Sequence, residues 1–397
     1  MSDLKPVPPG GAARVLKPSR RSRVAPFIAM DVMSAAARRE REGAHVIHME
    51  VGEPGAPVPM AARDAAMAAL AAGRIGYTEA LGRPALRARI ARHYGETYGV
   101  DLDPARVVVT TGSSAGFLLS FLALFDAGAR VAIAAPGYPA YRNILDALGI
   151  DTVTIETRAE TRHVVTADMI EAAHAQHKLD GVLLMSPANP SGTMMSPQAL
   201  AAICETCDRL GIAFISDEIY HGLTYVQPAE TALKFSRTPV VVNSFSKYFC
   251  MTGWRIGWLV LPDELVRPVE RLQQSLAISV PLLSQVAAEA VFESRPELEA
   301  IKQSYARNRD VLLNAFPGMN LGSFHPVDGA FYVYLDIGHL TNDSSEFCQR
   351  MLIEAGVAAT PGLDFDRERG NRTMRLSFAG SEADVVEAVS RLSNWLV

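Results

Sequence analysis

Between residues 106 and 261 the sequence alternates short apolar segments with amphipathic ones, and this alternation restricts the possible folds most. The apolar segments predict strands at residues 106–110, 130–134, 151–155, 181–185, 213–216, 240–243 and 255–261. The segments between them predict helices at residues 116–125, 140–148, 166–177 and 197–210. Strands that alternate with helices form βαβ units, whose largely parallel sheet is covered by helices on both faces. The sequence therefore predicts an α/β protein.

The pattern changes after residue 318. Residues 329–335 alternate apolar and aromatic side chains, and further strand and helix patterns follow. Such a mixture predicts a smaller α+β domain. We therefore divide the chain into an N-terminal arm and helix that join the small domain (1–45), a large domain (46–290) and a small C-terminal domain (291–397).

The composition excludes several classes of function. Of the 397 residues 49% are apolar and 20% are charged, which is typical of a globular chain with a large core. The net charge of −5 gives no basic surface for nucleic acid. The basic stretch that ends at Arg23 predicts a solvated arm, with a transit peptide or a tail for an anionic partner as alternatives. No apolar segment follows that stretch, so a secretory signal is not expected.

Cysteine usage and hydropathy point to a soluble protein of a reducing compartment. Four cysteines do not make a disulfide framework in a chain of this length, and we predict a cytoplasmic location. The uncharged run 107–125 contains turn-forming residues at its centre, so strand, turn and buried helix explain it better than a membrane span. No membrane association is predicted.

Lys247 stands just after a predicted buried strand, in the segment Asn243-Ser244-Phe245-Ser246-Lys247. Burial and nearby cations lower the pKa of a lysine and make its amine nucleophilic. Arg255 follows eight residues later between glycines, where a guanidinium can bind phosphate with two hydrogen bonds. On this segment alone, a surface lysine and a structural arginine are equally compatible with the sequence.

Three more segments carry polar side chains directly after predicted strands. Asp217 ends an apolar strand, at the edge where doubly wound sheets bind ligands, and Tyr220 follows it; an Asp that caps the next helix is the alternative. Asn189 stands in a loop rich in Pro and Gly. The small residues 111–116 predict an anion site at a helix N-terminus. They match no nucleotide-binding loop.

In their order along the chain these motifs resemble those of pyridoxal-phosphate-dependent aminotransferases of fold type I, in the class I/II group. The motifs are Ser-Pro-x-Asn-Pro-Ser-Gly, Ser-Asp-Glu-x-Tyr and Ser-x-Ser-Lys-x-x-x-Met-x-Gly-Trp-Arg-x-Gly. The resemblance extends from about residue 22 to the C-terminus. It implies a large domain with a mostly parallel, seven-stranded sheet between helices, and the smaller α+β domain.

The resemblance implies roles for residues around the cofactor, pyridoxal 5'-phosphate. Lys247 would form the Schiff base and shuttle a proton, and Asp217 would pair with the ring nitrogen. Tyr220 and Asn189 would bind the ring oxygen, and Tyr138 would stack on the ring. The remaining cofactor-binding residues, which surround the phosphate, would be Ser113, Ser114, Ala115, Ser244, Ser246, Arg255 and, from the neighbouring subunit, Tyr77. The last of these implies a homodimer with composite active sites.

The resemblance also implies how the substrate binds. Arg375 would clamp the α-carboxylate, with help from Gly52 and Asn189. The family's Pro-Gly-x-x-Phe-Gly ends here in Asp366 instead of glycine, which puts the loop shape and the substrate specificity in question. No second arginine for a side-chain carboxylate is evident. The candidates without motif support are Arg23, Arg74 and Arg271.

The function that this resemblance implies is transfer of an amino group from an L-amino acid to a 2-oxo acid by a ping-pong mechanism. A lyase on the same scaffold, such as a C–S lyase, is the alternative. A pyridoxal-phosphate-sensing regulator is a remote one, because too few residues precede the first strand for a DNA-binding domain. The histidines show no metal-ligand spacing, so no metal site is predicted.

Overall fold

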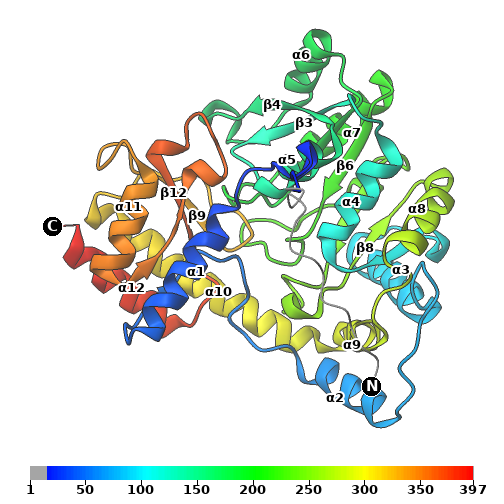
Figure 1. Cartoon of the computed structure of the whole chain (residues 1–397), viewed down its shortest axis with the longest axis horizontal. Coiled ribbons are helices and arrows are strands. Elements are labelled where there is room, and N and C mark those ends of the chain that lie inside the picture. The colour runs from blue at the N-terminus through cyan, green and yellow to red at the C-terminus, as the bar shows by residue number, and fades with distance from the viewer. Residues whose placement is uncertain (1–15, 397) are drawn as a thin grey trace, which may run out of the picture.

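The computed structural model describes residues 16–396, and a seven-stranded sheet forms its centre (Figure 1). The strand order across the sheet is β2-β8-β7-β6-β5-β3-β4. The strands are β2 (Val107–Thr110), β3 (Arg130–Ala135), β4 (Asp151–Glu156), β5 (Gly181–Met185), β6 (Ala213–Asp217), β7 (Val240–Ser244) and β8 (Gly257–Val260). All neighbours from β7 to β4 pair in parallel, and β8 is antiparallel to both of its neighbours, β2 and β7. The prediction of a mostly parallel α/β sheet is confirmed.

Helices cover both faces of this sheet, because successive strand residues point to opposite sides. Val107 and Val109 pack in one core with α2, α3, α6, α7 and α9, while Val108 packs in the other with α4, α5 and α8. The bounds are α2 (Met60–Ala71), α3 (Pro84–Tyr98), α4 (Gly112–Leu124), α5 (Pro139–Leu148), α6 (Ala167–His177), α7 (Pro197–Leu210), α8 (Asp263–Leu276) and α9 (Leu282–Val291). Burial on both faces explains why the strands are continuous apolar runs.

A second layer contains a three-stranded antiparallel sheet of order β11-β12-β9. In addition, β1 pairs in parallel with β10. The elements of this layer are β1 (Ile47–His48), β9 (Tyr332–Asp336), β10 (Val357–Ala358), β11 (Thr360–Pro361), β12 (Thr373–Ser377), α10 (Arg295–Ala315), α11 (Ser344–Arg350) and α12 (Glu382–Trp395). Helix α1 (Ile28–Arg41), near the start of the chain, lies against this layer (Figure 1). The domain boundaries at residues 46 and 291 stay a prediction.

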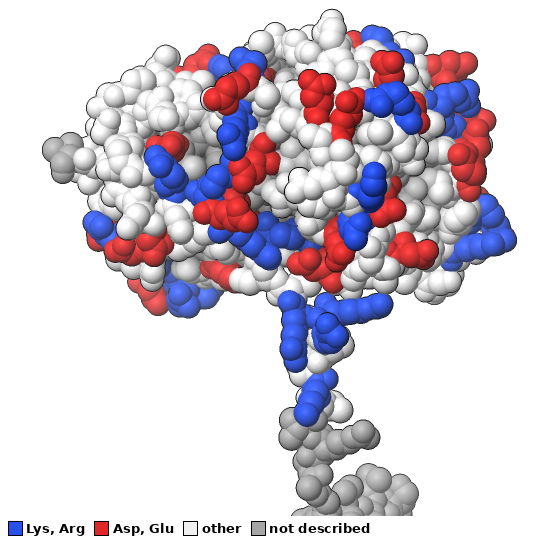
Figure 2. All heavy atoms as spheres, turned by 90° about the horizontal axis from the view of Figure 1, so that it is seen from above, with Lys and Arg blue, Asp and Glu red and all other residues white. Residues whose placement is uncertain are grey.

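The surface carries both signs of charge. Figure 2 shows positive and negative side chains interspersed on one face, with Lys and Arg gathered where the described chain begins. Within residues 16–396 no helix is long and apolar enough to cross a membrane. The uncharged run 107–125 instead forms β2 and α4. All four cysteines are free and buried.

We predict that Trp258→Ala lowers the free energy of unfolding by about 3–5 kcal/mol. Trp258 lies in β8 and is 1% exposed. Its ring packs 4.8 Å from that of Phe245, and its indole N–H donates to the Tyr94 hydroxyl at 3.2 Å. Urea unfolding followed by circular dichroism measures the loss. The control is Val386→Ala, whose side chain is 52% exposed and should change stability by less than about 0.5 kcal/mol. Equal effects of the two substitutions would contradict this assignment of the core.

Candidate active site

A cavity of about 200 Å³ lies where the carboxyl ends of the central strands meet the second layer. It brings together most of the residues that the sequence predicts: Gly52, Ser113, Ser114, Tyr138, Asn189, Asp217, Tyr220, Ser246, Lys247, Arg255 and Arg375. The topology explains this convergence. Asp217 is the last residue of β6, and Asn189 and Lys247 follow β5 and β7, so parallel strands deliver all three to one edge.

Lys247 projects its amine into this cavity. Its Nζ donates to the carbonyl oxygen of Gly52 at 2.5 Å. Burial, and after it the nearby cation of Arg375, lower the pKa of Lys247 to about 8. A substantial fraction of the amine is therefore neutral near physiological pH, and the neutral form is both a base and a nucleophile.

Asp217 is 1% exposed and is held from two sides. The Tyr141 hydroxyl donates to Oδ2, and the Ile219 backbone N–H donates to Oδ1 at 3.0 Å. Burial raises the pKa of Asp217 to about 7, while the bond from Tyr141 opposes the rise. A cation beside this carboxylate would lower its pKa again, so the site favours a positively charged partner.

At another side of the cavity, two positively polarised groups face each other. Helix α4 begins at Gly112, and a Cβ at that position would lie 2.5 Å from Nη2 of Arg255. Arg255 donates to the Thr252 carbonyl at 2.9 Å, and no carboxylate of residues 16–396 lies within 4.0 Å of it. A helix N-terminus beside an unpaired guanidinium is a strong site for an anion such as phosphate.

Arg375 is 3% exposed and approaches the cavity from β12. Its Nη1 donates to Oδ1 of Asn189 at 2.9 Å, and its guanidinium lies 4.3 Å from the ring centre of Tyr332. Its buried Nε has no hydrogen-bond partner in the described chain. A planar guanidinium with a donor to spare is suited to a carboxylate.

Three predicted residues lie outside the cavity wall. Ala115 is in the first turn of α4 behind Ser114, and the hydroxyl of Ser244 donates to Ser246 Oγ at 2.8 Å from behind it. Tyr77 is 83% exposed and does not line the cavity of its own chain. The roles of all these residues stay predictions.

The structure adds four residues that sequence reasoning did not find. Tyr332 in β9 hydrogen-bonds the Tyr220 hydroxyl at 2.7 Å, and Tyr141 contacts Asp217. Phe27 and Met30, from the start of α1, line the cavity. The aromatic alternation at residues 329–335 was the available signal for Tyr332. Tyr141 stands three residues after Tyr138, one helical turn away on the same face.

The residues present fit pyridoxal phosphate. A buried carboxylate suits the protonated ring nitrogen, the anion site suits the phosphate, and a depressed lysine pKa suits covalent attachment. Within residues 16–396, no group of three or more His, Cys, Asp or Glu side chains is placed to hold a metal ion.

We predict that the amine of Lys247 in the cofactor-free protein is acylated with a midpoint near pH 8, because only the neutral amine reacts. Competitive acylation followed by mass spectrometry measures the profile, with the exposed Lys178 as internal reference. Arg375→Met should move the midpoint to higher pH, since it removes a neighbouring cation. Identical profiles for Lys247 and Lys178 would contradict the burial argument.

Comparison with known proteins connects this geometry to a family. Residues 44–392 match the family described as aminotransferase class I and II. A valine–pyruvate aminotransferase of Mycobacterium tuberculosis is 48% identical over 380 residues, which cover 95% of this chain and 97% of the relative.

Solved structures agree with this match. An aminotransferase structure from Mycobacterium tuberculosis superposes with a TM-score of 0.94 at 47% identity and covers 96% of this chain and 99% of its own. Aspartate aminotransferase from Thermus thermophilus, determined with maleate, gives a TM-score of 0.91 at 29% identity, over 96% and 100% of the two chains. These relatives confirm fold type I, and they support the transfer reaction and not the lyase alternative. The chain therefore belongs to the class I and II aminotransferases and is a pyridoxal-phosphate-dependent enzyme that transfers amino groups from amino acids to 2-oxo acids.

Proposed function

We propose that the enzyme transfers the amino group of small apolar L-amino acids, such as valine, to pyruvate. The observation that carries this proposal is a set of apolar residues in the cavity lining, contributed by the start of α1 and the segment after β1, which we call the apolar wall: Phe27, Ala29, Met30 and Val51. Three cations line the cavity, namely Lys247, Arg255 and Arg375. We assign them to proton transfer, to the phosphate and to the α-carboxylate, so none is left for a second carboxylate. A substrate side chain thus meets apolar groups, and a second carboxylate would be buried without a partner.

The other arginine candidates do not change this picture. Arg23, Arg74 and Arg271 are exposed, and none of them lines the cavity of its own chain. The relative that is 48% identical is named for valine and pyruvate. That name supports both the donor and the acceptor that we propose.

We propose the following roles at the reacting atoms. The cofactor, when bound, supplies a ring that withdraws electrons from the substrate Cα. Asp217 holds a proton on the ring nitrogen, which strengthens that withdrawal. With the cofactor bound, the Lys247 amine would take the proton from the substrate Cα and would return one to the cofactor carbon that carries the amino group, because the neutral amine is a base. In the second half of the cycle the same amine acts in reverse on the 2-oxo acid.

The remaining residues bind and orient. Arg375 binds the α-carboxylate, with Asn189 and the backbone of Gly52 beside it. Tyr220 and Asn189 bind the ring oxygen, and Tyr138 covers one ring face. At the phosphate we place Ser113, Ser114, Ala115, Ser244, Ser246 and Arg255. Fixing the carboxylate and the ring places Cα near the Lys247 amine, so that proton transfer needs no further search for orientation.

We also propose a homodimer in which Tyr77 completes the partner's phosphate site. Large apolar side chains are exposed on α2 and in the segment that follows it, among them Met67 and Leu70. Ile278 is exposed as well, and the Thr78 backbone N–H donates to the Ser279 hydroxyl at 3.3 Å, which connects these two segments. Several large apolar side chains exposed on neighbouring segments are consistent with a surface that another chain covers. Free, buried thiols support a cytoplasmic location.

We predict that L-valine has a kcat/KM above that of L-aspartate by roughly 100-fold or more, since the cavity would bury the aspartate side chain unpaired. Mixing the holoenzyme with each amino acid, without oxo acid, measures this as loss of the visible cofactor absorbance. Met30→Arg adds a cation to the wall, so it should lower the ratio of kcat/KM for valine to that for aspartate. Met30→Gln is the uncharged control. A preference of the parent enzyme for aspartate would indicate a cation from the partner and refute the proposed donor.

We predict that two inactive variants restore activity when their subunits exchange. Lys247→Ala lacks the base, and Tyr77→Ala should bind the cofactor poorly. In a mixed dimer, the Tyr77→Ala chain keeps its own Lys247 and receives an intact Tyr77 from its partner. After random exchange at equal mixing, about half of the dimers are mixed, and each of these has one intact site of two. Activity should therefore rise from background to about a quarter of the parent value. Without recovery after verified exchange, the composite site is excluded.

A further inference from the structure

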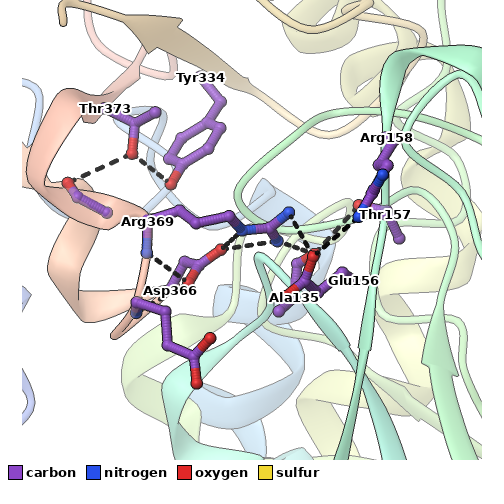
Figure 3. Close-up of polar contacts among 10 residues, drawn as sticks. Ala135, Glu156, Thr157, Arg158, Tyr334, Asp366, Arg369 and Thr373 are labelled. Atoms are coloured by element: carbon purple, nitrogen blue, oxygen red, sulfur yellow. Dashed lines mark hydrogen bonds and ion pairs between the residues drawn. The ribbon is translucent and has the colours of Figure 1, made fainter.

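The loop between β11 and β12, residues 362–372, connects the second layer to the central sheet (Figure 3). Arg369 of this loop donates to the Ala135 carbonyl at 3.0 Å and to Glu156 Oε2 at 3.4 Å. Ala135 and Glu156 are the last residues of β3 and β4, close to Tyr138. The Gly137 backbone N–H also donates to the Phe365 carbonyl at 3.1 Å. The loop is therefore fastened to the sheet edge that carries the active site.

Asp366, which replaces the family's glycine, shapes this loop. Its Oδ1 accepts the backbone N–H groups of Glu368 and Arg369, each at 3.0 Å, and its Oδ2 accepts Nε of Arg369 at 2.8 Å. Figure 3 shows the Arg369 guanidinium between Asp366 and the sheet. A glycine would provide none of these acceptors. The departure from the family pattern thus builds a rigid turn that holds Arg369 in position.

Two residues earlier, Asp364 caps a helix that is distant in sequence. Its carboxylate is 1% exposed and accepts the backbone N–H groups of Ile28 at 2.9 Å and of Ala29 at 3.2 Å. These are the first residues of α1, whose own N-cap residue, Phe27, contributes no side-chain hydrogen bond. A carboxylate at a helix N-terminus satisfies free N–H groups and opposes the positive end of the helix dipole.

The start of α1 is also the apolar wall of the cavity. Phe27, Ala29 and Met30 line it, and the Phe27 ring meets Tyr138 edge-on at 5.7 Å. Just before them, the Ala25 carbonyl accepts from the Asn143 side chain at 3.1 Å. The segment is thus tied to α5 on one side and to Asp364 on the other.

We propose that Asp364 is a positioning residue that sets selectivity for the substrate side chain, an inference that rests on the proposed apolar donor. Its two hydrogen bonds fix the first turn of α1, and that turn places Phe27 and Met30 over the cavity. Loss of the cap frees the turn and loosens the wall. A substrate with a branched side chain, which packs on the wall, then binds more weakly. The contact between the substrate α-carboxylate and Arg375 does not change.

The test compares L-valine with L-alanine, whose methyl group is too short to need the wall. In Asp364→Ala the ratio of kcat/KM for valine to that for alanine should fall about threefold to tenfold, mainly through KM for valine. Alanine turnover should stay within about twofold. Asp364→Asn keeps the side-chain volume and one acceptor, so the valine-to-alanine ratio should fall less in this variant. If Asp364→Ala does not fold, Asp364→Asn is the variant that tests the proposal.

The matched control is Asp343→Ala. Asp343 caps α11 with the same chemistry, accepting from the backbone N–H groups of Ser345 at 3.0 Å and Glu346 at 3.1 Å, and α11 does not line the cavity. The valine-to-alanine ratio should not change in this variant. Hydrogen exchange on the holoenzymes gives a readout apart from activity: the amides of Ile28 and Ala29 should exchange faster in Asp364→Ala and not in Asp343→Ala.

The possible outcomes distinguish the positioning role of Asp364 from the proposed apolar donor on which it rests. An unchanged ratio in Asp364→Ala, or unchanged exchange at Ile28 and Ala29, overturns the positioning role. An equal fall of the valine-to-alanine ratio in Asp343→Ala also overturns the positioning role, because the loss of any helix cap would then have the same effect. A parent enzyme that prefers aspartate to valine refutes the donor class instead, and the exchange of the two amides still decides whether Asp364 holds α1.

Discussion

The burial of opposite charges at the ends of two neighbouring parallel strands is the constraint on which the rest of this structure depends. Asp217 ends β6, and Lys247 follows β7. Burial raises the pKa of Asp217 to about 7 and lowers the pKa of Lys247 to about 8, so both groups populate their neutral forms to a substantial extent near physiological pH. Removing charges from water in this way is unfavourable, and a bound group that carries a cation and an anion relieves it.

The second layer has a different task from the sheet. The strand ends hold the groups that we propose to meet the cofactor, and the backbone of these strands is fixed by hydrogen bonds to neighbours on both sides. Arg375 comes from β12 and reaches Asn189 across the cavity. With the role that we propose for Arg375, substrate binding depends on how the second layer sits on the sheet, and Arg369 is one of the side chains that connect the two.

Local patterns in the sequence were sufficient for the sheet, and they placed Lys247, Asp217 and Asn189 at or shortly after the ends of apolar strands. The family resemblance, and not periodicity, pointed to other residues of the cavity such as Tyr138 and Arg375. The aromatic alternation at residues 329–335 was a local signal for Tyr332, but its contact with Tyr220, 112 residues away, comes from the tertiary fold and is encoded by no local pattern. The same holds for Phe27, whose place over the cavity depends on tertiary contacts of α1. Tyr77 differs again, since its predicted partner is a second chain.

The Asp366 substitution illustrates where sequence reasoning stops and packing begins. From the sequence, the missing glycine put the shape of the loop and the substrate specificity in question, without indicating what the loop does instead. In the structure the carboxylate organises a turn, the turn holds Arg369, and the loop so fixed carries Asp364 to the start of α1. Each step is a polar contact worth on the order of 1 kcal/mol. Contacts of that size can tune which side chain fits the cavity without disturbing the strand ends that hold the cofactor. Selectivity can thus change in this scaffold while the chemistry stays the same.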